Sequence, residues 1–256
     1  MTTQAFIFEE PLYKKVGLSD NPHVLDELMG RISIDGYNVQ KGTDSTFQLR
    51  NSLYSSFEYS NSTEQITFIC QRYGDPLYVQ IHYDRKQGFI EKVGQFPSVA
   101  DIHIAQIKQY RKVLGESYIK DFTKAIGLAA NGVGTGSFVY LRRVFEHLVH
   151  EIAEEAITNG DVERATFESS KMDNKLKLLS SYLPDVIMEN KSLYGVLSAG
   201  IHTLSEEDCL SHFSVVKSII ELILDEKEHE RLIMEKKKEA RDKLALIAGE
   251  VKKTTK

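Results

Sequence analysis

The stretch from Gly136 to Ile152 places an arginine and two histidines at helical spacing. Arg143 and His147 are four positions apart and His150 follows three positions later, so an α-helix presents all three on one side. Arginine holds phosphate charge, and histidine transfers protons near neutral pH. Such a set supplies what RNA cleavage without a metal needs: an acceptor for the ribose 2′-hydroxyl proton, a donor to the leaving oxygen and a cation for the phosphorane.

The same stretch also fits a solvated helix face that carries out no chemistry. Arg142 and Glu146, like His147 and Glu151, are spaced to form i,i+4 ion pairs, and exposed pairs of this kind contribute only about 0.3–0.5 kcal/mol each. The residue types favour this structural interpretation. Catalysis by Arg143 with the two histidines stays as the competing hypothesis.

The composition limits the class of protein. With 256 residues, 41% of them apolar, the chain holds one large domain or two ordinary ones, and a net charge of −5 argues against a general nucleic-acid coat protein. Cys70 and Cys209 lie far apart and outside any CxxC pair, which is typical of a reducing compartment. The first residues show no signal peptide, and no apolar run reaches the roughly 20 residues that span a bilayer. We therefore expect a cytoplasmic protein without membrane contact.

Residues 1–96 are predicted to form a small antiparallel sheet. Short runs rich in β-branched and aromatic residues alternate with turn residues, and one short helix is expected at 24–29. The expected strands are 33–37, 46–49, 65–70, 77–83 and 89–93, separated by turns at 41–45, 74–76 and 84–88.

Residues 97–226 are predicted to form a helical bundle. Ser98 and Asp101 are spaced to cap a first helix, and Ser205 and Asp208 are spaced to cap the last. The glycine-rich loop 131–136 ends a second helix that begins near Glu116. Further helices are expected from Ser137, at 171–182 and at 191–197, and the last shows apolar residues at 209, 213, 216, 220 and 223.

Residues 227–256 are predicted to form a charged helical extension. After an almost wholly charged run, lysine-rich turns alternate with Ala240, Leu244 and Ile247. A helix that extends beyond the hydrophobic core and keeps an apolar stripe either packs against a partner chain or frays. The predicted fold class is therefore α+β, with a β-rich domain, a bundle and an extension.

Two segments of the bundle carry a resemblance to a known superfamily. Arg142-Arg143-Val-Phe-Glu146 and Ser198-Ala-Gly-Ile-His202 resemble the HEPN superfamily, over about residues 137–224. Its members are compact helical bundles of prokaryotic toxin, antitoxin and antiviral systems. In its nucleases four to six residues lie between an arginine and the histidine that follows it. Four residues lie between Arg142 and His147 and six between Arg143 and His150, so both pairs meet these limits. The resemblance implies a homodimer, with Arg142 and His202 as further RNA contacts.

The β-rich part carries a second, weaker resemblance. Asn38-Val-Gln-Lys41 and Cys70-Gln-Arg-Tyr73 stand where a zinc ribbon would place its two knuckles between strands. Zinc in a closed structural site takes four nitrogen or sulfur donors, and only one of these four positions is a ligand type. We expect a degenerate ribbon in which packing has replaced the metal, and no metal or cofactor in the chain.

The sequence thus predicts a HEPN-like component of a prokaryotic antiviral defence or toxin-type system. It would assemble through its helical half, as a homodimer or with a partner protein, and contact RNA or that partner. One alternative is a metal-independent endoribonuclease that uses Arg143, His147 and His150. The other is a purely structural assembly factor that works through the C-terminal helix.

Overall fold

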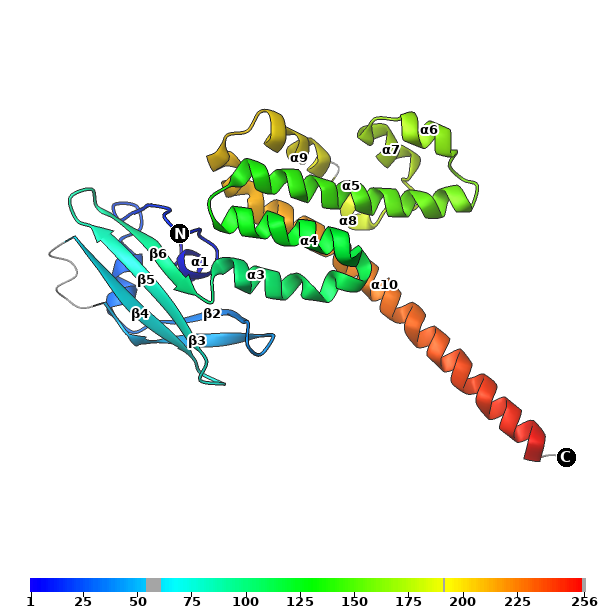
Figure 1. The fold of residues 1–256 in the computed structure, drawn as a ribbon, viewed down its shortest axis with the longest axis horizontal. Coiled ribbons are helices and arrows are strands. Elements are labelled where there is room, and N and C mark those ends of the chain that lie inside the picture. The colour runs from blue at the N-terminus through cyan, green and yellow to red at the C-terminus, as the bar shows by residue number, and fades with distance from the viewer. Residues whose placement is uncertain (54–60, 191, 255–256) are drawn as a thin grey trace.

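The protein is α+β, as predicted: a six-stranded antiparallel sheet precedes a set of helices, the last of which is long (Figure 1). The computed structural model describes residues 1–53, 61–190 and 192–254, with side chains as far as residue 248. Buried apolar side chains form one cluster under the sheet and a second among the helices.

The sheet has the strand order β1-β6-β5-β4-β3-β2, and every neighbouring pair is antiparallel. Alternation decides its faces: Ile66 and Phe68 of β4 are buried, while the side chain of Gln65 is exposed. The strands are β1 (Val16–Gly17), β2 (Ser33–Asn38), β3 (Thr43–Asn51), β4 (Ser62–Cys70), β5 (Pro76–Asp84) and β6 (Phe89–Phe96). All five expected strands are confirmed.

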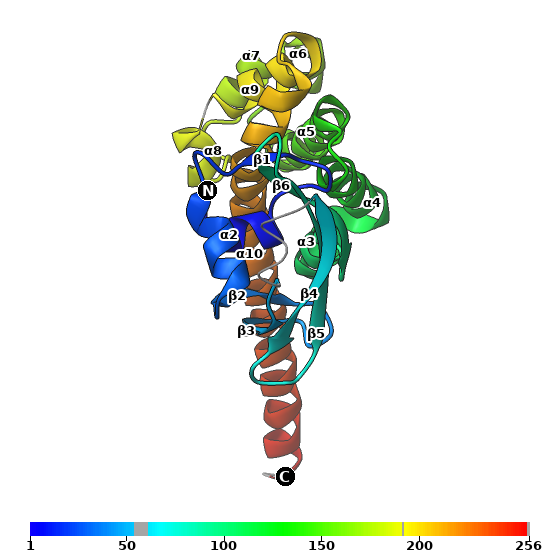
Figure 2. The same ribbon diagram turned by 90° about the vertical axis from the view of Figure 1, so that its left-hand side faces the viewer.

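Three helices contribute to the core of the sheet: α1 (Thr3–Phe8), α2 (Pro22–Met29) and α3 (Val99–Ile107). Ser98 and Asp101 form the predicted capping box at the start of α3. Ile102 of α3 belongs to the buried cluster under the sheet, so the first helix after residue 97 joins the two halves of the chain. Figure 2 shows the sheet in front of α3 and α10.

The remaining helices form the bundle and the extension. A 3-10 turn, η2 (Lys108–Tyr110), joins α3 to α4 (Arg111–Ala130), and Gly115 breaks α4 with φ 70°, so its regular part begins at the expected Glu116. The others are α5 (Gly134–Thr158), α6 (Arg164–Ser169), α7 (Met172–Leu178), α8 (Asp185–Glu189), α9 (Leu193–His202) and α10 (Glu206–Thr254).

Several boundaries differ from the sequence prediction. α5 begins at Gly134 rather than Ser137, because the carboxylate of Glu206 accepts hydrogen bonds from the Gly134 and Thr135 backbone N–H groups. α7 ends at Leu178, four residues early, and α9 runs on to His202. The sequence prediction missed α1, β1, α6 and α8, and the predicted start at 191 lies outside the described residues.

α5 is the central helix of the bundle, since α4, α9 and α10 all pack against it. Its side chains Phe138, Leu141, Phe145 and Leu148 are almost fully buried. α9 approaches α5 closely at Gly200, where a Cβ atom would lie 2.0 Å from Cδ1 of Phe138. The spacing of apolar residues in α5 thus decides where three neighbouring helices lie.

α10 has two parts with different surroundings. Cys209, Val216, Ile220 and Ile223 are buried in the bundle, as their spacing predicted. The helix then continues to Thr254 and leaves the other helices behind, toward the C end in Figure 1. Its apolar side chains between Arg231 and Gly249 are exposed.

One charged side chain lies inside the N-terminal half. Lys92 of β6 is 0% exposed, and its amine donates hydrogen bonds of 2.8 Å to the Ile7 carbonyl and to Oε1 of Gln95. Burial lowers the pKa of Lys92 to about 7, against the smaller opposing effect of Glu10. The buried amine ties α1 to the sheet and holds a proton less firmly than an exposed lysine does.

The Lys92 pKa predicts a pH-dependent stability. Because the unfolded chain keeps this proton up to about pH 10.5 and the folded chain loses it near pH 7, the free energy of unfolding should rise with pH between these values. The slope from this one group is at most about 1.4 kcal/mol per pH unit. Urea unfolding of the wild type and of Lys92→Met across pH 7–10 measures it. The exposed Lys86→Met is the matched control, and curves of equal slope for wild type and Lys92→Met would contradict the assignment.

Candidate functional site

The α5 residues that the sequence singled out are held by partners from neighbouring helices. Arg142 donates to Oε1 of Glu146 at 2.8 Å and to the Tyr194 hydroxyl of α9 at 2.7 Å. The hydrogen bond and charge of Glu146 raise the pKa of Arg142. The expected Arg142–Glu146 pair is therefore present, and Arg142 serves the contact between α5 and α9.

Arg143 and His147 face α4 instead. Arg143 forms an ion pair of 3.1 Å with the buried carboxylate of Asp121, while more than half of the arginine side chain stays exposed. The His147 ring stacks on Tyr118, with ring centroids 3.5 Å and planes 5° apart. Its Nε2 lies 3.3 Å from Glu151, the partner that the sequence predicted.

Glu151 links this face to α10, because its other oxygen lies 3.1 Å from the amine of Lys227. Burial disfavours the charge of Glu151, but the hydrogen bond from His147 and the charge of Lys227 together lower its pKa. Each of these groups therefore has a structural partner before any ligand binds.

His150 and His202 complete the predicted set. The His150 ring meets Phe167 of α6 edge-on at 5.3 Å, and burial with nearby Lys175 lowers the pKa of His150. His202 is exposed and is the last residue of α9. It lies eight residues, about 12 Å along the helix, from Tyr194, the α9 residue that contacts Arg142. The structure keeps Arg143, His147 and His150 on one side of α5 and leaves His202 apart.

The two ribbon-like knuckles lie side by side. Oδ1 of Asn38 accepts from the backbone N–H groups of Gln40 and Lys41, two and three residues on. Cys70 likewise accepts hydrogen bonds from the backbone N–H groups two and three residues on, at 72 and 73, and from the Asn38 side chain. Burial by itself would raise the pKa of Cys70, but these hydrogen bonds outweigh burial and lower the pKa. The amine of Lys41 lies 5.7 Å from the Tyr73 ring. Four knuckle positions thus converge without four metal donors.

Among the described residues, no group of three or more histidine, cysteine and acidic side chains is arranged to hold a metal ion. The described helices include none that is both long enough and apolar enough to cross a membrane.

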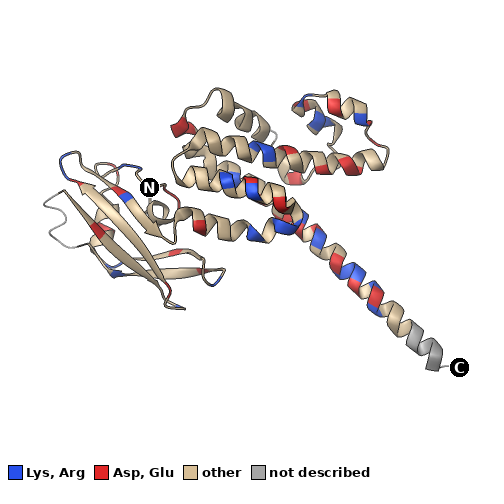
Figure 3. Cartoon of the chain, viewed as in Figure 1, with Lys and Arg blue, Asp and Glu red and all other residues tan. Residues whose placement is uncertain are grey.

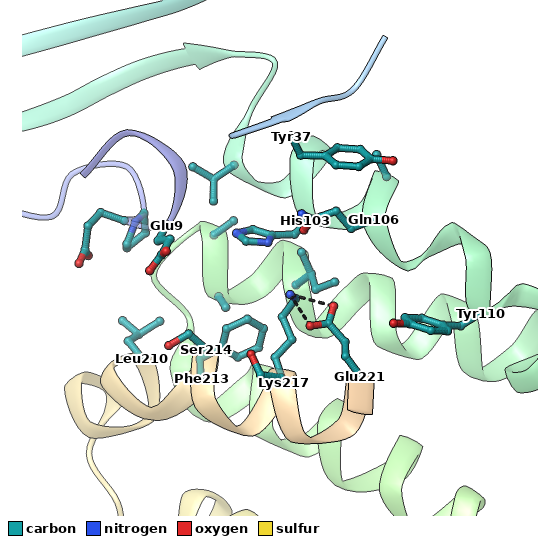
Figure 4. Close-up of a pocket in the computed structure, with 18 of the residues that line it drawn as sticks. Glu9, Tyr37, His103, Gln106, Tyr110, Leu210, Phe213, Ser214, Lys217 and Glu221 are labelled. Atoms are coloured by element: carbon teal, nitrogen blue, oxygen red, sulfur yellow. Dashed lines mark hydrogen bonds and ion pairs between the residues drawn. The ribbon is translucent and has the colours of Figure 1, made fainter. Parts of the chain in front are cut away.

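A groove of about 960 Å³ lies between the two halves of the chain (Figure 4). Arg143, His147 and His150 are not among the residues that line it. The loop after α1 and the β2–β3 turn form one wall, α3 forms another, and α10 forms the third. Figure 4 shows His103 of α3 and Lys217 of α10 pointing into the same space. Lys217 donates to Glu221 at 2.9 Å, and the Tyr110 hydroxyl donates to Asp225 at 2.7 Å.

The groove has an acidic lining. Its walls carry five carboxylates and two lysines, and each lysine is already paired: Lys14 with Glu10 at 2.6 Å and Lys217 with Glu221. The carboxylates of Glu9 and Asp44 are exposed and have no side-chain partner within the described part of the chain. Such a lining repels phosphate and attracts positive charge.

His103 adds no positive charge to the groove. Burial, then the nearby charge of Lys217, lower its pKa to about 4, so the imidazole is neutral at physiological pH. Its Nδ1 is buried and makes no hydrogen bond within the described residues. A ligand group that donates a hydrogen bond would satisfy this nitrogen.

Sequence reasoning missed the groove. Its walls come from residues more than 200 positions apart, and spacing along the chain does not reveal such neighbours. One signal was present: Lys217 directly follows Val216 in the buried stripe of α10, where a lysine needs a partner.

In comparisons with known proteins, no family model, no curated protein and no solved structure matches this chain.

The converging knuckles predict that a metal site can be restored. Asn38→Cys, Lys41→Cys and Tyr73→Cys, together with Cys70, should give four thiolates that bind one Zn²⁺ per chain, since backbone N–H groups already point at both first positions. Co²⁺ absorption of the tetrahedral thiolate type, lost on adding Zn²⁺, measures it. The triple serine variant is the matched control. Equal metal uptake by both would show that the four positions do not form a site.

Proposed function

We propose that the chain is a non-catalytic binding and assembly component, HEPN-like in its helical half, of a prokaryotic antiviral defence or toxin-type system. Its groove receives a basic segment of a partner protein. One observation carries the proposal: the groove of about 960 Å³ between the two halves has an acidic lining, and both of its lysines are paired.

The arrangement of α5 supports a structural role for the predicted motif. Arg142, Arg143 and His147 each bind a carboxylate of the same chain, and His147 also stacks on Tyr118. A general base or a phosphate-binding arginine has to be released from such partners before it meets a substrate. The proposal includes a cytoplasmic location, supported by two unpaired and buried cysteines.

The rival proposal is a metal-independent endoribonuclease, and one observation favours it. Arg143, His147 and His150 stay on the same side of α5, and Arg143 and His150 are exposed. The neutral form of His150 is favoured by its lowered pKa, as a general base requires. RNA contact belongs to this rival, because phosphate does not suit the acidic groove.

The endoribonuclease proposal is tested by incubating RNA with the purified protein in EDTA and measuring cleavage of the RNA. We expect no cleavage by the wild type and no difference from His147→Ala or His150→Ala, because the α5 groups are engaged. His212→Ala, an exposed histidine on α10, is the matched control. Cleavage by the wild type and His212→Ala that falls about 100-fold or more in the two α5 variants would establish the nuclease instead. Equal degradation by all four proteins would mean a contaminating nuclease and no activity of this chain.

The groove is tested with two labelled ten-residue peptides, one alternating lysine and alanine and one alternating glutamate and alanine. Fluorescence anisotropy should show binding of the basic peptide only, weakening as salt rises. Glu9→Gln with Asp44→Asn should weaken binding severalfold, because it removes the unpaired carboxylates. Asp20→Asn with Asp26→Asn makes the same charge change on the same half outside the groove and should have little effect. Preference for the acidic peptide, or equal losses in both double variants, would contradict the proposal.

A further inference from the structure

α10 carries a seam of exposed residues from Val215 to Ile247. Val215 and Leu222 are 61% and 51% exposed where the helix packs on the bundle, and Leu244 and Ile247 are 66% and 56% exposed on the extension. His229, Ile233 and Ala240 lie between them, and the steps of three, four or seven residues keep all of these side chains on one side of the helix. From Val215 to Ile247 the seam runs about 48 Å.

Apolar side chains at this spacing, outside any core, are the pattern by which one helix packs along another. The bundle already covers the opposite side of α10, where Cys209, Val216 and Ile220 are buried. No described element of the same chain lies over the seam on the extension (Figure 1). A helix from another chain is therefore needed to bury it.

Charge is divided unequally along the chain. Residues 232–256 carry eight lysines and arginines against four carboxylates, so the rest of the chain holds all of the acidic excess. Along the seam, Asp225 and Glu226 come before the extension, and Lys236 and Lys237 lie within it; all four are exposed. Figure 3 shows basic and acidic residues along the part of α10 that leaves the bundle.

We infer that the partner is a second copy of this chain, and that two α10 helices pack antiparallel about a two-fold axis beside Arg231. In this register Val215 meets Ile247 of the partner subunit, and Leu222 meets Ala240 of the partner subunit. The acidic pair at 225–226 then lies opposite the partner's basic pair at 236–237, twice in the dimer. The contact closes on itself, as a two-fold interface does.

A parallel pair is disfavoured by the same residues. If two parallel α10 helices packed in register, each residue would lie opposite the same residue of the partner subunit. The basic pair at 236–237 would then face a second basic pair, and the acidic pair at 225–226 would face a second acidic pair. In the antiparallel arrangement each basic pair lies opposite an acidic pair, so the charges attract each other. Three seam residues, Ser218, Leu222 and Asp225, also line the groove. The antiparallel arrangement therefore places the partner's lysines beside the acidic residues of the groove. The inference rests on the proposed function, because it identifies the basic segment that the groove receives.

The first test is the mass of the full chain by light scattering after gel filtration. We expect a dimer of twice 29.1 kDa. Lys236→Glu with Lys237→Glu should weaken the dimer about tenfold or more, because attraction becomes repulsion, and adding Asp225→Lys with Glu226→Lys should restore it. Lys238→Glu changes the same kind of charge on the outer side of the helix and should leave the dimer intact. A monomeric wild type, or no rescue by the fourfold variant, would overturn the inference.

The second test fixes the direction of the helices. Leu222→Cys with Ala240→Cys should give a disulfide-linked dimer on mild oxidation, because the two positions meet across the axis. Within one straight helix they lie about 27 Å apart, too far for an internal disulfide. Ala240→Cys alone should stay unlinked, whereas a parallel pair would link it. The native cysteines are buried and do not compete.

The two proposals can fail separately. A chain that stays monomeric but binds the basic peptide in the groove overturns the second copy as partner and keeps the proposed function. A chain that forms the antiparallel dimer while neither wild type nor the Lys236→Glu, Lys237→Glu variant binds the basic peptide overturns the groove as a binding site. That outcome supports the alternative of a purely structural assembly factor.

Discussion

The helical half depends on the burial of α5. Phe138, Leu141, Phe145 and Leu148 are buried together, and α4, α9 and α10 take their places against them. At about 25 cal/mol per Å² of apolar surface removed from water, a few such side chains outweigh any ion pair on the helix surface. Close approach is part of this constraint, because Gly200 leaves room for the Phe138 ring.

The polar side of α5 follows from that packing. The packing of α4 places the carboxylate of Asp121 beside Arg143 and the ring of Tyr118 against His147. The packing of α9 places the hydroxyl of Tyr194 beside Arg142. Arg142, Arg143 and His147 therefore make contacts between helices in this structure. A resemblance in residue type does not by itself carry the chemistry of a family.

α10 joins the two surfaces that the proposals use. One side completes the bundle core, a second borders the groove, and a third stays exposed as it leaves the bundle. A straight helix cannot bend to cover its own far end, so a helix longer than its bundle must leave apolar residues for another chain or for water. The lysines of the extension and the carboxylates around the groove carry opposite charges within one sequence.

The sequence by itself determined the elements that depend on near neighbours. The alternation around Ile66 gave β4, the Ser98–Asp101 pair gave the start of α3, and the period after Ser205 gave α10, because these signals act over a few residues. Only the tertiary structure decided which partners the α5 side chains take and that a groove exists. Arg143 of α5 pairs with Asp121 of α4, and His103 and Lys217 line the same groove although they are more than a hundred residues apart. Such pairs depend on how whole helices pack, and local spacing holds no information about that.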